Sequence, residues 1–328
     1  MAGRKGRRSG APRVLVVGSA NVDIVVPVRK LPASGETVLG GERKEFWGGK
    51  GANQAVAAQK AGAEVRLVSA LGSDGFGAAY RKYLADVGIG RRGLISVPGP
   101  TGTALIVVDE KGRNQIAVSP GANSFLTPGL LEDKRKKDVM EYGEVVLAQL
   151  EVPREMVSAA FRSAKRRGAV TVLNPAPAPK AIPSRLMSLV DVLVPNETEA
   201  AALCGMRRRV RKTSGLVRLC RNLREKGAKA VVLTAGEKGA LVFGEAESGW
   251  VKPPAGIRPV DTTGAGDAFC GALAARLARK APLADAVRFA VAAASLSVQK
   301  RGAQTGIHGR RAIQQAMRRT RFEREFAC

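Results

Sequence analysis

The strongest constraint on the fold is a regular alternation of apolar strands and helices in the second half of the chain. Strands are predicted at residues 144–148, 169–173, 191–194, 230–234 and 240–243, and helices at residues 153–166, 197–203, 214–225, 266–278 and 283–298. The pattern extends toward the N-terminus. Further strands are predicted at residues 13–18 and 65–69, one further helix is predicted to end near residue 61, and another is predicted at residues 74–87. Such alternation predicts an α/β fold, with a mainly parallel sheet covered by helices on both faces.

Four extended segments fall outside this alternation: residues 23–28, 37–46, 101–109 and 114–118. The last two are joined by a short turn and form a predicted hairpin. We expect the four segments to form a small separate sheet that covers a ligand crevice as a lid. The expected organisation is a basic flexible tail at residues 1–10 and one α/β domain at residues 11–328. Lid segments at about residues 23–46 and 101–118 are inserted in that domain.

Polar residues follow several of the predicted strands. Any one of them alone would be an ordinary loop residue. The carboxyl ends of parallel strands meet at one edge of a sheet, however, and α/β proteins keep their ligands there. The residues expected at this edge are Asn21, Asp23, Glu151, Asn174, Asn196, Glu199 and residues 234–239.

A glycine-rich loop, DTTGAGDAF at residues 261–269, lies between an extended run predicted at residues 257–260 and the predicted helix at 266–278. The expected free backbone N–H groups at Gly264, Ala265, Gly266 and Asp267, together with the helix dipole, favour a phosphate or a developing anion. Asp267 would repel a bound anion unless it takes a proton from a hydroxyl that attacks phosphorus. An ordinary helix start with a glycine turn would look similar. A second loop, WGGKGAN at residues 47–53, also allows a close ligand approach, and it does not match a Walker loop.

Composition limits the remaining possibilities. The chain has 328 residues with 45% hydrophobic content, which supports a sizeable core. No apolar run approaches the ~20 residues of a membrane span, and the N-terminus has no apolar signal segment. Four widely spaced cysteines and a single histidine, His308, argue against a zinc site. We therefore expect a cytoplasmic protein with reduced thiols.

The chain is strongly basic, with 54 Lys and Arg against 28 Asp and Glu, a net charge of +26. Clusters lie at residues 4–8, 207–212 and 310–324. A polyanion partner is one interpretation of this charge. Aromatic residues make up only 4% of the chain, however, which leaves few stacking platforms for single strands. A solvated basic surface is the preferred interpretation, and nucleic-acid binding is not expected.

Five motifs occur in a specific order along the chain. They are GGKGANQAVAA (48–58), LNPAPA (173–178), VPNETEA (194–200), DTTGAGDAF (261–269) and RFAVAAASLSV followed by GAQ (288–304). From about residue 14 to 306, the chain resembles the ribokinase-like (PfkB-type) carbohydrate kinases, and the first two motifs point more narrowly to ribokinases. The resemblance implies a three-layer αβα fold with a β-sheet lid. It also implies ATP-dependent phosphorylation of D-ribose at O5, giving D-ribose 5-phosphate, by a homodimer formed through the lid.

The resemblance further implies the roles of individual residues. Asp267 would be the general base, and Gly264, Ala265 and Gly266 would form the anion hole for the transferred phosphoryl group. The sugar would be held by Asn21, Asp23, Gly49, Lys50, Gly51, Asn53, Glu151 and Asp267.

Three further sites are implied for ATP, Mg²⁺ and K⁺. The nucleotide would be held by Asn196, Thr234, Ala235, Gly236, Glu237, Lys238, Gly239, Gly266 and Val291. Asn196 and Glu199 would hold Mg²⁺ through water. K⁺ would lie in a cage formed by Asp261, Thr263, Ser297, Lys300, Gly302 and Gly306. Two positions depart from the family pattern. Gly306 stands where a small hydroxylated ligand is expected, and Val291 is apolar where ribokinases often carry a polar residue.

Several alternatives remain open at this point. Another kinase of the same family could act on deoxyribose, a hexose or a nucleoside. A nucleic-acid-binding protein could use the same fold. A catalytically silent sugar sensor is a third alternative, against which the intact Asp267 and GAGD sequence argue.

Overall fold

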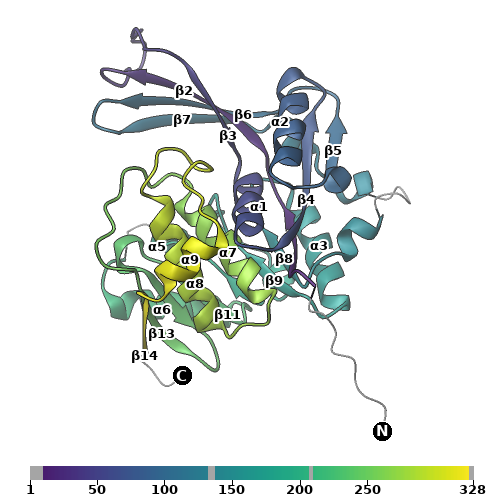
Figure 1. Cartoon of the computed structure of the whole chain (residues 1–328), viewed down its shortest axis with the longest axis vertical. Coiled ribbons are helices and arrows are strands. Elements are labelled where there is room, and N and C mark those ends of the chain that lie inside the picture. Colours follow the sequence, from purple (N-terminus) through teal and green to yellow (C-terminus); the bar gives the residue numbers. More distant parts are fainter. Residues whose placement is uncertain (1–9, 132–136, 207–209, 325–328) are drawn as a thin grey trace.

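The computed structural model of the protein describes residues 10–131, 137–206 and 210–324 (Figure 1). The expected basic tail, apart from Gly10, lies outside the described residues, as do residues 207–209 of the second basic cluster and Cys328. Within the described ranges, no helix is long and apolar enough to cross a membrane. The cysteines in these ranges, Cys204, Cys220 and Cys270, are free thiols.

A ten-stranded sheet forms the centre of the described part of the molecule (Figure 1). Its parallel strands lie in the order β5 (Leu94–Val97), β4 (Glu64–Gly72), β1 (Arg13–Val17), β8 (Val145–Ala148), β9 (Val170–Leu173), β10 (Val192–Leu193) and β11 (Ala230–Thr234). Antiparallel strands extend the sheet beyond β11: β12 (Ala240–Phe243), β13 (Ser248–Lys252) and β14 (Arg321–Arg324). The mainly parallel sheet expected from the alternation is therefore confirmed.

Strand β1 shows how one strand contacts two layers of helices. Val14 and Val16 pack into one core, whereas Leu15 and Val17 pack into a second core on the opposite face. Successive side chains of a strand point to opposite faces, so a central strand covered on both sides is apolar throughout.

The helices divide between these two faces of the sheet. The first core includes residues of α1 (Lys50–Lys60), α2 (Gly75–Asp86), α7 (Ala265–Leu277), α8 (Leu283–Ser297) and α9 (Arg310–Met317). The second core includes residues of α3 (Arg154–Arg166), α4 (Ser184–Met187), α5 (Glu197–Leu203) and α6 (Thr213–Glu225). Short 3-10 helices connect these elements at Arg91–Gly93, Gly121–Phe125, Pro128–Leu131, Lys137–Glu141 and Gly236–Lys238.

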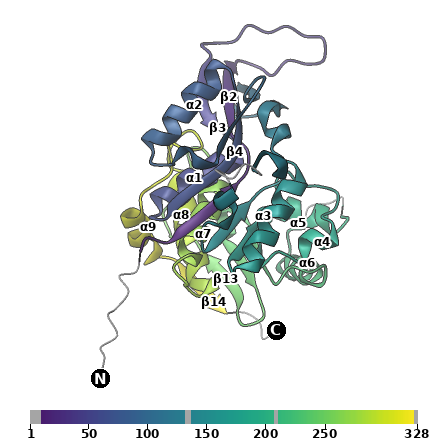
Figure 2. The same cartoon turned by 90° about the vertical axis from the view of Figure 1, so that its right-hand side faces the viewer.

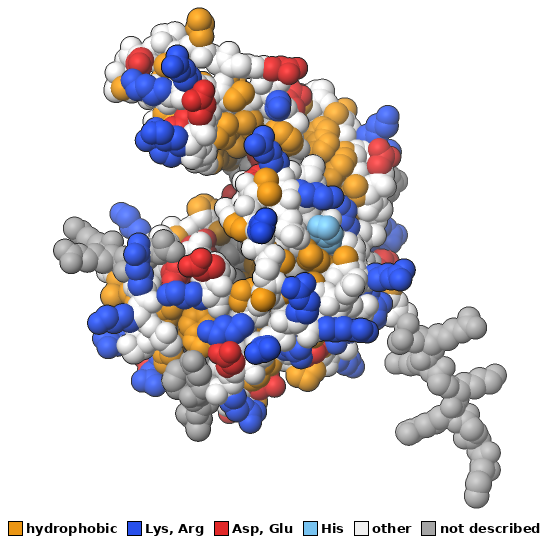
Figure 3. Space-filling model, turned by 60° about the vertical axis from the view of Figure 1, so that its left-hand side comes forward, with side chains coloured by type: hydrophobic (Ala, Val, Ile, Leu, Met, Phe, Trp, Pro, Cys, Tyr) orange, Lys and Arg blue, Asp and Glu red, His pale blue; other side chains and the backbone are white. Residues whose placement is uncertain are grey.

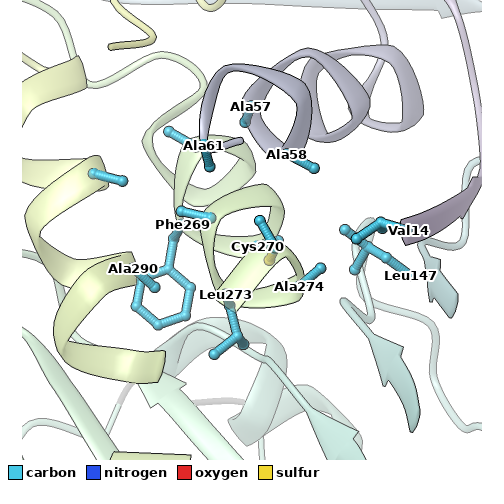
Figure 4. Packing of buried hydrophobic residues seen from close by; sticks show 14 of the residues in the cluster. Val14, Ala57, Ala58, Ala61, Leu147, Phe269, Cys270, Leu273, Ala274 and Ala290 are labelled. Atoms are coloured by element: carbon cyan, nitrogen blue, oxygen red, sulfur yellow. The ribbon is translucent and has the colours of Figure 1, made fainter. Parts of the chain in front are cut away.

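Small residues allow α1 and α7 to approach each other closely. Figure 4 shows Ala57 and Ala58 of α1 packed near Cys270 and Ala274 of α7. A Cβ atom added at Gly271 would overlap the carbonyl oxygen of Gln54 and lie 2.5 Å from the Cβ of Ala57. Only glycine therefore fits at this crossing. The close contact places the first turns of α1 and α7 side by side.

The four extended segments outside the alternation form a separate sheet, as predicted. Its order is β3 (Lys44–Gly48), β2 (Asn21–Val28), β6 (Gly102–Asp109) and β7 (Asn114–Ser119). Strands β2 and β6 are parallel, and the two outer strands pair antiparallel to them. This sheet projects away from the central sheet, with a long loop at its tip (Figures 1 and 2). We call this sheet the lid.

One predicted lid segment is only partly a strand, and one predicted extended run is absent. Within residues 37–46, strand β3 begins only at Lys44, and Gly40 makes no more than an isolated bridge to Val28. Two consecutive glycines interrupt the run there, and glycine weakens a strand. Residues 257–260 form no strand either. Pro259 has no N–H group for a ladder, and the Val260 N–H group donates instead to the carbonyl of Val298.

The pattern also missed some elements. Strands β5, β13 and β14 and helices α4 and α9 were not predicted. Strand β14 has the sequence RFER, with one apolar residue, and is defined by its pairing with β13. A short charged edge strand has no periodic signal of its own, so only its partner reveals it.

Candidate active site

The carboxyl ends of five parallel strands meet at one edge of the central sheet. Strands β1, β8, β9, β10 and β11 run in the same direction, so the polar residues that follow them gather at this edge, as predicted. The lid leaves the sheet from the same edge, because β2 begins at Asn21, shortly after β1 ends. Figure 3 shows a deep notch between the lid and the body of the molecule.

Helix α7 begins at this edge with a glycine turn. Gly264 caps the helix with a left-handed φ of 75°, and a Cβ atom there would lie 2.7 Å from the Cβ of Ala303. Gly264 is therefore required by the backbone. A Cβ atom at Gly266 would meet no atom within 4 Å, so packing does not require glycine at that position.

The N–H groups of this turn differ from the expectation in one respect. The Ala265 N–H group donates to the carbonyl of Thr262 at 3.2 Å, so it is not free. The N–H groups of Gly264, Gly266 and Asp267 find no acceptor among the described residues. The glycine turn and the first turn of α7 thus offer three backbone donors, at the positive end of the helix dipole.

The carboxylate of Asp267 lies at the start of α7 and is only 7% exposed. Asn53 Nδ2 donates to its Oδ2 at 2.9 Å, and Gln54 Nε2 donates to its Oδ1 at 3.0 Å. Burial raises the pKa of Asp267 above its usual value, while the charge of Lys50 and the two amides oppose that rise. A buried carboxylate with a raised pKa suits a general base.

Three charged residues predicted to hold a sugar lie near Asp267. The Glu151 carboxylate accepts hydrogen bonds from the Ser19 hydroxyl at 2.5 Å and from the Lys50 backbone N–H group at 3.1 Å. The Lys50 ammonium group lies 3.9 Å from the same carboxylate. Burial and, to a smaller extent, the charges of Glu151 and Asp267 raise the pKa of Asp23 to about 7, against the opposing charge of Lys50. Opposite and like charges are therefore concentrated in one small region.

The remaining predicted sugar residues, Asn21, Gly49 and Gly51, are closely packed at the same edge. The Asn21 side-chain oxygen accepts a hydrogen bond from Asn123 Nδ2 at 2.7 Å. Gly49 has a φ of 84°, and a Cβ atom there would lie 2.6 Å from the backbone nitrogen of Asn21. A Cβ atom at Gly51 would lie 2.5 Å from the backbone nitrogen of Ser19. These glycines let the start of α1 approach the end of β1.

The predicted nucleotide and Mg²⁺ residues also come together. Asn196 caps α5 in a capping box: its side chain accepts from the Glu199 N–H group, and the Glu199 carboxylate accepts from the Asn196 N–H group, both at 2.8 Å. Asn196 pairs in parallel with Thr234, which begins the loop at residues 234–239. Burial raises the pKa of Glu199. The hydrogen bond from the Asn196 N–H group and the charge of Lys50 oppose this rise.

Two loops predicted to hold K⁺ are joined by one side chain. The Asp261 carboxylate accepts hydrogen bonds from the N–H groups of Thr263 at 2.9 Å and Gly302 at 2.8 Å. Its partial burial opposes ionisation, but these hydrogen bonds lower its pKa overall. A Cβ atom at Gly306 would overlap the carbonyl oxygen of Ser297. Gly306 thus packs directly against one of the predicted ligands.

Two of the predicted nucleotide residues have contacts of a different kind. Val291 of α8 is 4% exposed and packs in the hydrophobic core. Lys238 is exposed, and its amine donates to the carbonyl of Arg211 at 3.2 Å. The basic residues 310–324 lie on α9, on β14 and in the turn between them, and these segments supply no residue to the site described above.

Sequence reasoning gave no role to several polar residues that complete the site. Gln54 and Gln304 are buried beside Asp267 and Asn53, and Ser19 and Asn123 support Glu151 and Asn21. One available signal was a glutamine within an alanine-rich, otherwise buried helix, where an unpaired amide would be costly. Gln54 is such a residue.

Comparisons with known proteins agree with this geometry. The sequence profile of the "pfkB family carbohydrate kinase" matches residues 11–309. A ribokinase from Staphylococcus aureus is 39% identical over 299 residues, with 90% of this chain and 96% of that protein covered. A deoxyribokinase from Salmonella typhi is 35% identical over 293 residues, with 89% and 94% covered. This chain is 38% identical to a bifunctional ribokinase/ribose-5-phosphate isomerase A from Fructilactobacillus sanfranciscensis over 96% of its own length, but spans only 59% of that protein.

Solved structures show the same fold. The structure of Arabidopsis thaliana ribokinase complexed with ribose and ATP superposes with a TM-score of 0.85 at 32% identity, covering 94% of this chain and 99% of that one. The ribokinase from Thermotoga maritima superposes with a TM-score of 0.82 at 34% identity, covering 93% and 99%. The large parallel sheet with a four-stranded lid is therefore the ribokinase-like fold.

Proposed function

The chain belongs to the pfkB family of carbohydrate kinases, and we propose that it transfers the γ-phosphoryl group of ATP to O5 of D-ribose. The observation that carries this proposal is that the Asp267 carboxylate and N–H groups without an acceptor among the described residues lie together at the start of α7. The same helix start thus offers a general base that can take the proton of a hydroxyl group and N–H donors that can bind an anion. The relative that was solved with ribose and ATP supports this choice of substrates.

The proposed reaction uses Asp267 as the general base. Its carboxylate takes the proton of the O5 hydroxyl while O5 forms a bond to the γ-phosphorus and the bond to the ADP oxygen breaks. Burial keeps the pKa of Asp267 above its usual value, which makes the ionised group a stronger base. The Gly266 and Asp267 N–H groups donate to the charge that develops on the phosphoryl oxygens.

Sugar recognition is assigned to the charged and amide groups around Lys50. The hydroxyl groups of ribose need both donors and acceptors, which carboxylates, amides and one ammonium group supply. Asp23 and Glu151 accept, Lys50 donates, and Asn21 and Asn53 can do both. Gly49 and Gly51 permit the close approach of the backbone.

The residues at the nucleotide end fit a magnesium ion held through water. Glu199 is a carboxylate whose Oε2 atom accepts from the Asn196 N–H group, which leaves Oε1 for a water molecule. Among the described residues, no group of three His, Cys, Asp or Glu side chains could hold a metal ion. Mg²⁺ retains several waters and is commonly held by one carboxylate and substrate phosphates, where it neutralises phosphate charge. Residues 234–239 are assigned to the nucleotide.

The two loops joined by Asp261 fit a monovalent cation in part. Backbone carbonyl oxygens of Asp261, Thr263, Ser297, Lys300 and Gly302 are hard donors, which suit K⁺. A cation there would stabilise the glycine turn electrostatically. Gly306 supplies no side-chain oxygen, and a serine in its place would overlap the Ser297 carbonyl unless the loop shifts. The proposed cage is therefore one ligand short.

The lid is the proposed surface of a homodimer. Its outer strand β7 is exposed along its whole length, and Ile116 and Val118 on it are more than half exposed. An edge strand with apolar residues is stabilised when it pairs with another chain. A second lid would supply both a strand edge and an apolar face.

A substrate panel tests the proposed activity. ADP formation is measured with ATP, Mg²⁺ and K⁺ in the presence of D-ribose, deoxyribose, a hexose or a nucleoside. We expect the largest kcat/KM with D-ribose. The deoxyribokinase relative makes deoxyribose the second candidate, and a higher kcat/KM with deoxyribose would replace the proposed substrate. Retention on RNA or DNA without any sugar phosphorylation would favour the nucleic-acid alternative.

A further inference from the structure

Both oxygens of Asp267 accept hydrogen bonds from amide side chains whose orientation is not free. An amide presents an acceptor on one side and a donor on the other, so a reversed Asn53 or Gln54 would place an oxygen against the carboxylate. The orientation therefore depends on what lies behind each amide.

Behind Asn53, a chain of hydrogen bonds ends on a backbone carbonyl. The Tyr80 hydroxyl donates to the Gly48 carbonyl at 2.6 Å, and a carbonyl can only accept. The oxygen of Tyr80 is then an acceptor for Gln304 Nε2, at 3.3 Å. The same nitrogen donates to Asn53 Oδ1 at 2.8 Å, so Asn53 must turn its Nδ2 toward Asp267.

Behind Gln54, a second chain ends in the same way. Asn174 Nδ2 donates to the Val194 carbonyl at 3.0 Å, so Asn174 Oδ1 faces Gln54. Gln54 Nε2 donates to that oxygen at 3.1 Å and to Asp267 Oδ1 at 3.0 Å. Gln149 Nε2 donates to Gln54 Oε1 at 2.5 Å and holds the other side of this amide.

We propose that Tyr80, Gln304 and Asn174 are positioning residues that fix the polarity of both amides, so that Asp267 meets only N–H donors and is held as the carboxylate. A protonated carboxyl group needs an acceptor for its proton, and neither fixed amide offers one. If a chain is cut, its amide can turn over and accept that proton. The protonated form of Asp267 is then no longer disfavoured.

Other charged and titratable groups also influence Asp267, and they are the same in the variants below. They are Lys50 of α1, Asp23 of β2, Glu151 after β8, Glu199 of α5, and Cys270 of α7. Burial raises the pKa of Asp267, and the two chains act against that rise. This inference rests on the proposed function only where it gives Asp267 a role in catalysis. The titration of Asp267 tests the two chains of hydrogen bonds whether or not the protein is a kinase.

The test compares two tyrosines that differ in their place in the first chain. Tyr80→Phe removes the anchor to the Gly48 carbonyl, whereas Tyr83→Phe removes only the hydroxyl that donates to Gln304 Oε1 at 2.7 Å. The titration of Asp267 is followed by carbon NMR of aspartate-labelled protein, with Asp267→Asn identifying its signal. We expect the pKa of Asp267 to rise by about one unit, a tenfold shift in its protonation equilibrium, in Tyr80→Phe and Gln304→Met. Tyr83→Phe should leave it unchanged.

Asn174→Ala tests the second chain if a first-chain variant does not fold. It should raise the pKa of Asp267 in the same direction, and the acid limb of the kcat profile should move with the NMR titration. Some of the variants Tyr80→Phe, Gln304→Met and Asn174→Ala will fold. If Asp267 has the parental pKa in every variant that folds, the inference is overturned. If these variants shift the titration but the parent protein does not phosphorylate D-ribose, the positioning chains stand and the proposed function fails.

Discussion

At the residue scale, the start of α7 contains two glycines that serve different purposes. Gly264 is required by its left-handed φ of 75° and by its contact with Ala303. Gly266 has no such requirement, because a Cβ atom there would be free of contacts. A glycine without a structural reason, beside unpaired N–H donors, is consistent with the approach of a ligand to the backbone.

This difference predicts opposite outcomes for two alanine variants. Gly264→Ala should lower the free energy of unfolding by about 1–2 kcal/mol, because alanine is strained in the left-handed region. Gly266→Ala should leave that free energy unchanged or slightly raised, yet lower kcat by at least about tenfold by crowding the phosphoryl group. Urea unfolding and a coupled ADP assay measure the two effects. Full activity in Gly266→Ala would show that the anion does not bind at this turn.

The raised pKa of Asp23 predicts how the affinity for ribose depends on pH. Its pKa is raised to about 7, so the carboxylate is ionised above that pH and protonated below it. Only the ionised form offers all of its lone pairs to sugar hydroxyl groups. The Kd for ribose, measured by calorimetry without ATP, should therefore rise as the pH falls below about 7. Asp23→Asn should bind more weakly and lose this inflection, and an inflection that persists would have to come from another group.

At the element scale, the site depends on the close crossing of α1 and α7. Asn53 and Gln54 belong to α1, and Asp267 belongs to α7, so the distance between the two helices sets their hydrogen bonds. Gly271 maintains that distance, since any side chain there would overlap the Gln54 carbonyl. A packing residue in the core thus controls the geometry of the base.

Gly271→Ala should show this coupling. Overpacking at the crossing is expected to lower the free energy of unfolding by about 1–3 kcal/mol and to reduce kcat more than it changes the KM for ATP. Gly75→Ala is a matched control, because a Cβ atom at that helical position meets nothing within 4 Å. The control should retain parental stability and activity. Equal behaviour of the two variants would mean that the helices can separate without harm.

The sequence predicted the elements that carry a periodic signal, and it missed contacts between distant segments. The buried strands and the polar residues at their ends were visible because parallel strands must share one edge. The partner of Asn53 was not visible, because Gln304 lies 251 residues away along the chain. The polarity of an amide depends on such contacts, and no local pattern encodes it. The short charged strand β14 was missed for a similar reason.

At the scale of the whole molecule, a notch separates the lid from the body (Figure 3), and the lid leaves the central sheet at the edge where the site residues gather. Strand β2 carries Asp23 in the lid, while Asp267 belongs to the body. In the proposed reaction, closure of the lid on a sugar would exclude water from the region around these two carboxylates. The proposed dimer would place a second copy against the exposed lid strand β7.

If the protein is a homodimer, light scattering at micromolar concentration should give about twice the 34.4 kDa mass of one chain. Ile116→Lys on β7 should shift the protein toward the monomer, because a charged side chain disfavours edge pairing. Leu39→Lys, at an almost fully exposed position in the loop at the tip of the lid, is the control and should remain dimeric. A monomeric parent protein would remove the proposed interface.

The central claim is tested most directly by one comparison of products. The parent protein and Asp267→Asn are incubated with D-ribose, ATP and Mg²⁺, and phosphorus NMR follows the formation of D-ribose 5-phosphate. The parent protein should form this product, and Asp267→Asn should form it about 10²–10⁴ times more slowly while still binding ribose and ATP. Near-parental turnover in Asp267→Asn, or phosphorylation at an oxygen other than O5, would contradict the account.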